Sequence, residues 1–171
     1  MFRRFLTTTS IALLAAVPAI ADGPSDPVVE PAPTFDVAQP VSDWTGFYAG
    51  ANVTAGVTGG GTQFWGPGIQ AGYLYDTGEF VFGGEASYNY LIGGDHLGAV
   101  DAIFGYDAGN VMPHLTLGGT YLSNEFGVSG GAGLSVKATE NVLLNARYRY
   151  SYYPGVPAHT HQGIVSVSYR F

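Results

Sequence analysis

Few residues of this 171-residue chain could do chemistry, because only 11% of them are charged and none is cysteine. Without cysteine the chain has no disulfide, no thiol nucleophile and no thiolate metal ligand. The formal net charge of -7 provides no basic patch for the phosphates of a nucleic acid. The remaining candidates are four histidines and a small set of carboxylates, arginines and one lysine.

The four histidines are the candidates for catalysis or metal binding. No G-x-S-x-G motif or comparable nucleophile arrangement lies near them in the sequence, so we expect no enzyme activity. His159 and His161 are separated by one residue, and alternate residues of an extended loop point to the same side. Joined by His96 from a neighbouring loop, they could bind a transition metal or haem iron. Two loop histidines are more often incidental, and we expect no metal and no cofactor.

Six charged residues between positions 85 and 170 alternate with apolar or small ones at a spacing of two. Arg147 and Arg149, for example, stand between Ala146, Tyr148 and Tyr150. In a β-strand this spacing sends the charges to one face of the sheet and the apolar side chains to the other. The residues with this placement are Glu85, Asp101, Lys137, Arg147, Arg149 and Arg170.

The elements that must position these residues are strands, because the period of two continues from residue 44 to residue 171 in eight segments. Short polar connections at 76–79, 107–110 and 138–141 start 31 residues apart, which indicates one hairpin per repeat. The connections at the opposite end are expected at 58–62, 93–97, 122–125 and 154–162, the last being the longest. The sequence therefore predicts an all-β protein, an eight-stranded antiparallel up-and-down β-barrel.

The larger apolar side chains lie on one face of each segment, and the other face is mostly glycine, serine and threonine. Because an eight-stranded barrel is only wide enough inside for side chains to fill it, the large residues must face outward. About ten residues per strand, tilted by roughly 40°, give the apolar band of about 25 Å that transmembrane barrels show. A soluble lipocalin-like barrel is the alternative, but we expect a transmembrane barrel.

Two groups of inward-facing residues would fill this lumen. Glu85 and Asp101 are expected to pair with Arg147 and Arg149 in a lumen charge network to which Lys137 and Arg170 also belong, because an uncompensated buried charge costs several kcal/mol. Near the 76–79 end, five large side chains break the alternation, point inward and predict an apolar stopper: Tyr48, Leu74, Val81, Ile103 and Leu143.

The start of the chain carries two further expected segments. Residues 1–21 have the basic start, apolar stretch and small-x-small ending of a secretory signal peptide, so we expect cleavage after Ala21. Residues 22–43 contain five prolines and five acids with no basic residue, which is typical of a disordered leader or linker. The barrel would then cover residues 44–171.

Four stretches of the chain resemble the small outer-membrane β-barrel family of Gram-negative bacteria, of the opacity-protein and OmpA-like porin type. They are Trp44-Thr-Gly-Phe-Tyr-Ala-Gly50, Gly131-Ala-Gly-Leu134 with Ala138-Thr-Glu-Asn141, Ala146-Arg-Tyr-Arg-Tyr150 and Val167-Ser-Tyr-Arg-Phe171. The resemblance implies location in the outer membrane, with the amino end and short turns in the periplasm. It also implies that Phe171 is part of a signal read by the barrel-assembly machinery.

These observations lead to one functional expectation with two alternatives. We expect a non-enzymatic integral outer-membrane protein, a monomer in contact with membrane lipid, that contributes to envelope structure and has a plugged lumen. One alternative is a narrow porin-like channel in which the same charges form a gate. The other is a surface barrel that binds haem, a metal or an adhesion partner, for which the 154–162 loop is the candidate.

Overall fold

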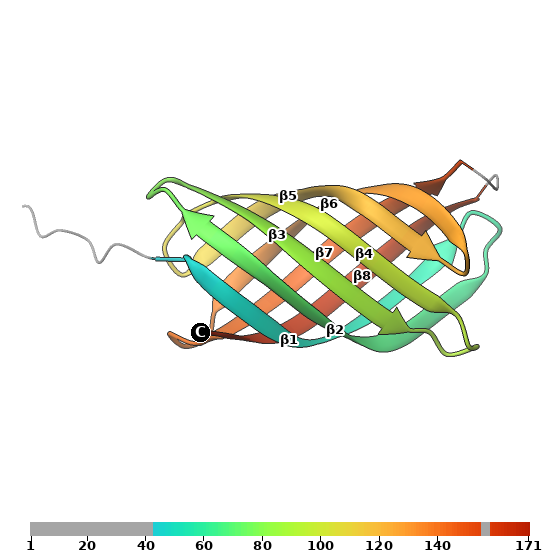
Figure 1. The fold of residues 1–171 in the computed structure, drawn as a ribbon, viewed down its shortest axis with the longest axis horizontal. Helices are drawn as coiled ribbons and strands as arrows, with labels where there is room; N and C mark the ends of the chain where they lie inside the picture. Colours follow the sequence, from blue (N-terminus) through green and yellow to red (C-terminus); the bar gives the residue numbers. More distant parts are fainter. Residues whose placement is uncertain (1–42, 155–157) are drawn as a thin grey trace, which may run out of the picture. The chain divides into compact units, whose positions relative to one another are not determined.

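The computed structural model describes residues 43–154 and 158–171, which form a closed barrel of eight strands. Each strand is antiparallel to the next, and β1 closes the barrel by pairing with β8 (Figure 1). The predicted eight-stranded up-and-down barrel is confirmed. The strands are β1 (Gly46–Thr58), β2 (Gln63–Asp76), β3 (Phe80–Tyr90), β4 (His96–Tyr106), β5 (Val111–Leu122), β6 (Glu125–Lys137), β7 (Val142–Tyr153) and β8 (Ala158–Arg170).

The two ends of the barrel are distinguished by the chain ends. The base holds the start of β1, the end of β8 and the connections 77–79, 107–110 and 138–141. The far rim holds the connections 59–62, 91–95, 123–124 and 154–157, which have nearly the same lengths as those of the base. Figure 1 shows the carboxyl end beside the start of β1, at the base.

Two expected far-rim connections were placed wrongly. His96 and Leu97 are the first residues of β4, and the 154–162 connection is shorter than predicted because β8 begins at Ala158. The reason is cross-strand pairing, since Thr160 pairs with Ser151 and Gln162 pairs with Arg149. A surface loop of nine residues at this position, proposed as a ligand-binding segment, is therefore not present.

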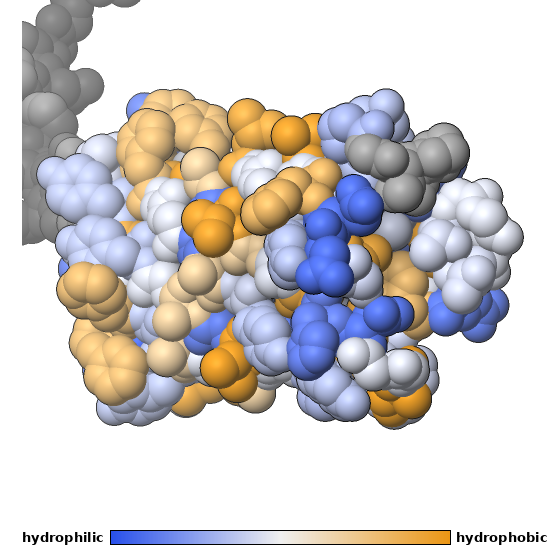
Figure 2. Space-filling model, turned by 45° about the vertical axis from the view of Figure 1, so that its right-hand side comes forward, coloured by the Kyte–Doolittle hydropathy of each residue, from blue (hydrophilic) through white to orange (hydrophobic). Residues whose placement is uncertain are grey.

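The alternation expected from the sequence determines which side chains face out. Along β5, Leu115 and Leu117 are 60% and 73% exposed, while the neighbouring residues His114 and Thr116 are buried. The same holds around the barrel, and Figure 2 shows hydrophobic side chains over much of one face, with strongly hydrophilic ones gathered toward one end. No helix among the described residues is long and apolar enough to cross a membrane.

Aromatic side chains collect on the outer surface at both ends. Toward the base, the ring of Phe104 lies 5.6 Å from that of Phe80 and 5.3 Å from that of Phe82. Toward the far rim, tyrosine and histidine rings pair across β3 and β4 and across β7 and β8. Amphipathic rings at two levels around an apolar band are typical of the interfaces of transmembrane barrels.

The expected signal peptide 1–21, its cleavage after Ala21 and the leader up to residue 42 lie outside the described residues.

Candidate functional site

The middle of the lumen contains a cluster of four charged side chains from three strands. Glu85 of β3 and Asp101 of β4 are register partners, and Arg147 and Arg149 project toward them from β7. Arg147 Nη2 lies 2.5 Å from Glu85 Oε1, Arg147 Nη1 lies 3.7 Å from Asp101 Oδ2, and Arg149 Nη2 pairs with the same Asp101 oxygen. We call this set the lumen charge network.

This network is almost completely shielded from solvent and is electrically balanced. Arg149 is 0% exposed and Asp101 is 2% exposed. Two carboxylates face two guanidinium groups, so the network carries no net charge. Hydroxyl groups add to the shell, since Tyr48 donates to Glu85 Oε2 at 2.7 Å and Ser129 donates to Asp101 Oδ1 at 3.2 Å. Among the described residues, Arg147 Nε and the Nε and Nη1 atoms of Arg149 are buried without a hydrogen-bond partner. The buried charges are therefore tolerated mainly because they are paired.

Glycine on the inner face makes room for the network. A Cβ atom on Gly72 would lie 2.6 Å from the Tyr48 hydroxyl, and one on Gly118 would lie 2.5 Å from Asp101 Oδ1. Both distances are too short for real atoms, so these positions must lack a side chain. The inward glycines of the sequence pattern therefore provide the space that long charged side chains need in so narrow a barrel.

Lys137 and Arg170 do not join this network, although both were expected in it. They lie at the base, where Lys137 Nζ donates to the carbonyl oxygen of Asp43 at 2.9 Å and Arg170 donates to the carbonyl oxygens of Asp43 and Glu140. The reason is height, because Lys137 ends β6 and Arg170 ends β8 at the base of the barrel. The alternation correctly shows that both side chains face inward, but it does not show how deep in the barrel they lie.

Asp43 is fixed at this base by hydrogen bonds of its own. The backbone N–H of Thr45 donates to the Asp43 carboxylate at 2.8 Å. This bond, a second one from the Thr45 side chain and the nearby charges of Arg170 and Lys137 hold the pKa of Asp43 below its usual range. The chain therefore enters the barrel as an anionic, hydrogen-bonded turn beside two cations.

An apolar cluster closes the lumen at the base. The expected stopper is confirmed, since Tyr48, Leu74, Val81, Ile103 and Leu143 are all buried and belong to one cluster. Sequence reasoning missed two members, Trp44 and Met112. Met112 is two residues before His114 on β5 and faces inward with it, so the alternation could have indicated Met112. Trp44 precedes β1, so no strand alternation predicts which way its side chain points.

Trp44 is held in this cluster by two hydrogen bonds and a cation. Its indole Nε1 donates to Asp107 at 3.0 Å, its backbone N–H donates to Asp76 at 3.0 Å, and the Lys137 ammonium lies 4.3 Å from the ring centroid. The ring is 0% exposed. Trp44 thus connects the first residues before β1 to the turns after β2 and β4.

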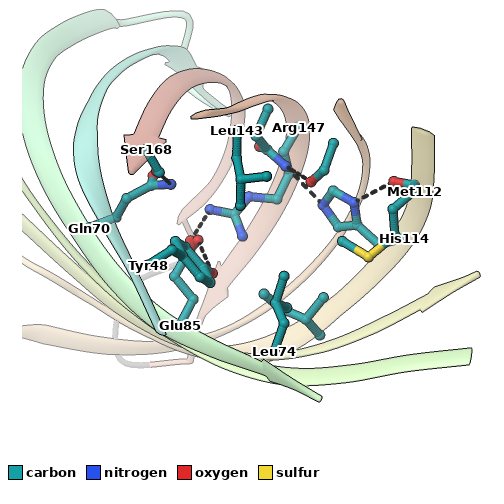
Figure 3. Close-up of a pocket in the computed structure, with 12 residues that line it drawn as sticks. Tyr48, Gln70, Leu74, Glu85, Met112, His114, Leu143, Arg147 and Ser168 are labelled. Atoms are coloured by element: carbon teal, nitrogen blue, oxygen red, sulfur yellow. Dashed lines mark hydrogen bonds and ion pairs between the residues drawn. The ribbon is translucent and has the colours of Figure 1, made fainter. Parts of the chain in front are cut away.

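Between the stopper and the ion pairs the lumen holds a small cavity of about 20 Å³ (Figure 3). It lies beside Glu85, Arg147 and His114. Such a volume has room for about one water molecule, which needs roughly 10–15 Å³. His114 donates from Nδ1 to the Met112 carbonyl at 3.3 Å, and its Nε2 lies 3.3 Å from the amide nitrogen of Asn145. No carboxylate orients this imidazole, so His114 has the surroundings of a structural residue.

The three histidines considered for metal binding face outward, and His96 does not join the other two. His96 starts β4 and contacts Tyr88 and Tyr90, whereas His159 and His161 lie on β8. Within residues 43–154 and 158–171, no group of three histidine, aspartate or glutamate residues is arranged to hold a metal ion.

Phe171 lies just beyond β8 on the outer surface. It is 76% exposed, and its ring packs edge-on against Tyr169 with centroids 5.3 Å apart. Its backbone N–H donates to the Phe47 carbonyl at 2.9 Å, which extends the β1–β8 pairing to the last residue.

The lumen charge network predicts strong coupling between its members. We expect Glu85→Gln or Arg147→Met alone to lower the free energy of unfolding by about 3–5 kcal/mol, because each leaves a buried partner uncompensated. The double variant should lose less than the sum of the two. Urea unfolding of protein folded in phospholipid vesicles measures both effects, with the exposed Glu140→Gln as a control expected to change stability by less than about 0.5 kcal/mol. Strict additivity would show that the pair does not interact.

Comparison with known proteins gives relatives of the same size and kind. No protein-family model matches the chain. The 25 kDa outer-membrane immunogenic protein of Brucella canis is 31% identical, over 86% of this chain and 84% of the relative. The protein of the same name from Brucella ovis is 30% identical, over 97% of both chains.

Solved structures share the fold at low identity. The attachment invasion locus protein Ail of Yersinia pestis has a TM-score of 0.56 and 14% identity, covering 74% of this chain and 97% of Ail. Neisserial surface protein A has a TM-score of 0.53 and 22% identity, covering 74% and 98%. The outer-membrane enzyme PagL has a TM-score of 0.50 and 14% identity, covering 71% and 99%.

The relatives and the fold agree on the bacterial outer membrane as the location of this barrel. The chain belongs to the family of the Brucella 25 kDa outer-membrane immunogenic proteins, small eight-stranded outer-membrane β-barrels of Gram-negative bacteria.

Proposed function

We propose that this protein is a non-enzymatic, non-conducting monomeric barrel that contributes to the structure of the outer membrane. The observation that carries the proposal is the filled lumen. At mid-depth the lumen charge network occupies the space, and at the base the stopper and Trp44 occupy it. The cavity between the two layers, of about 20 Å³, has room for about one water molecule.

The far rim supports the same proposal. Leu91, Leu97 and Tyr153 point inward there and are each 2% exposed or less. An ion crossing this barrel would have to pass these apolar side chains, then two fixed ion pairs, then the stopper. A charge that leaves water for such surroundings without a partner pays a cost of several kcal/mol, which opposes steady conduction.

A lipid-active enzyme is disfavoured by the placement of the histidines. An enzyme of this kind needs a nucleophile, a base and an orienting group together on a surface that lipid can reach. His114 is inside the lumen, and the described outward histidines have tyrosines as their ring neighbours. The shared fold of PagL shows only that barrels of this type can carry such a site.

The outward surface and the ends of the chain are consistent with a structural protein of the outer membrane. The apolar wall would contact outer-membrane lipid, and Phe171 would be presented to the barrel-assembly machinery. Signal-peptide cleavage near Ala21 would precede both events, and the amino end and the base would face the periplasm. The short far-rim connections leave little surface for a receptor or a bulky ligand.

Planar bilayers test the closed lumen. We expect purified, folded protein to give no stable single-channel currents at voltages at which a porin inserted in the same lipid conducts. The Trp44→Gly variant should also remain silent, because the ion pairs still block the lumen at mid-depth. Reproducible unitary currents from the unaltered protein would overturn the proposal.

Mass analysis of outer-membrane lipids tests the absence of enzyme activity. Membranes from cells with and without the gene should give the same lipid masses. A change by the mass of an acyl chain that is lost with the gene and restored with it would contradict the proposal.

A further inference from the structure

Two histidine side chains lie next to each other on the outer face of β8. His159 and His161 are separated by one strand residue, and the inward-facing Thr160 between them is buried. Their ring centroids are 5.6 Å apart with the ring planes at 88°. The proposed structural role of the barrel does not use this pair.

Neighbouring residues fix the positions of both rings. The hydroxyl oxygen of Tyr148 lies 2.5 Å from His161 Nδ1. With Nδ1–H donating to this oxygen, Nε2 of the ring keeps the lone pair that a metal ligand needs. The ring of Tyr150 lies 6.0 Å from His159 and 5.2 Å from His161. On the other side, Gly59 donates its N–H to the His159 carbonyl at 2.7 Å, and a Cβ on Gly59 would lie 2.7 Å from His159 Nε2. The imidazole therefore packs directly over a residue without a side chain.

We propose that His159 and His161 form a two-ligand site for a divalent first-row transition metal ion, such as Ni²⁺, Cu²⁺ or Zn²⁺. Imidazole nitrogen suits these metals. With metal–nitrogen distances of about 2.0–2.1 Å and the rings at adjacent coordination positions, the ring centroids would be roughly 5 Å apart. The separation of 5.6 Å in the structure is close to this value. Water would complete the coordination shell.

The hydrogen bond between Tyr148 and His161 is the kind of contact that supports a metal ligand. A histidine that binds a metal through one nitrogen usually has its other nitrogen in a hydrogen bond, which sets the tautomer and the ring orientation. Tyr148 supplies that partner before any metal is present.

The electrostatic surroundings favour a cation. The four lysine and arginine residues of the described chain are in the lumen or at the base. None of these fixed positive charges therefore faces the two imidazoles on the outer surface of β8. The ion would approach a neutral aromatic surface without repulsion from these groups.

The geometry favours a free ion over haem iron. A haem leaves its iron only two axial positions, which lie on opposite sides of the porphyrin. The two histidine rings lie on the same face of one strand and are separated by one residue. They can take adjacent coordination positions on an ion, but they cannot lie on opposite sides of a porphyrin.

His96 provides a matched control from the same aromatic surroundings. The Tyr88 hydroxyl group hydrogen-bonds to His96 Nδ1 at 2.5 Å, and Tyr90 packs against the ring, as Tyr148 and Tyr150 do for His161. His96 lies on β4, however, and its ring contacts are with tyrosines. It therefore offers one imidazole in place of two.

Isothermal titration calorimetry with NiCl₂ and ZnCl₂, on the untagged full chain in detergent, tests the proposal. We expect one ion per chain, with affinity reduced at least tenfold by His159→Asn and by His161→Asn and unchanged by His96→Asn. Electron paramagnetic resonance of bound Cu²⁺ should show two equatorial nitrogens in the unaltered chain and one in either β8 variant. Gel migration that changes on boiling confirms that each variant is folded.

Equal affinities in all four proteins would overturn the site, as would loss of binding in the His96→Asn variant alone. Haem binding that depends on both β8 histidines, without binding of the free ions, would also overturn it. Each of these results would leave the proposed structural role unchanged, because no lumen residue is altered.

Discussion

The constraint on which this barrel depends is that four full charges lie inside a cylinder too narrow to hydrate them. Glu85, Asp101, Arg147 and Arg149 satisfy it by pairing across the lumen. An unpaired charge there would cost several kcal/mol, a large part of the stability of a small domain. The inward glycines give these long side chains space, and the large apolar residues must then face the lipid.

Closure of the lumen follows from the same constraint. Ion pairs alone would leave the base open to water, which would screen them and weaken their attraction. The apolar cluster around Trp44 and Leu143 keeps water out on that side, and Tyr153 and Leu97 cover the far rim. The network is therefore strong because both ends are closed, and this same closure is the basis for a structural rather than a conducting role. The connections between the described strands are only a few residues long at both ends.

Much of this arrangement could be predicted from the sequence, because a period of two separates inside from outside in every strand. Glu85 and Arg147 could be matched in height by counting from the turns that precede them. The alternation does not apply to residues outside strands, so Trp44 was missed. It also gives no depth, so Lys137 and Arg170 were counted with the lumen charge network although they lie at the base. The start of β8 was placed late because histidine, threonine and glutamine resemble a loop until Ser151 and Arg149 are seen opposite them. That early start is what puts His159 and His161 on one strand face.

The central claim is that the two arginines are locked in ion pairs that are shielded from bulk solvent. Solution NMR of the protein in micelles measures this directly through the guanidinium protons of Arg147 and Arg149. The structure predicts separate Nη–H resonances that exchange slowly with solvent and that are lost for Arg147 when Glu85 is replaced by Gln. A single averaged signal for each arginine, exchanging as fast as that of a free arginine in water, would contradict the account.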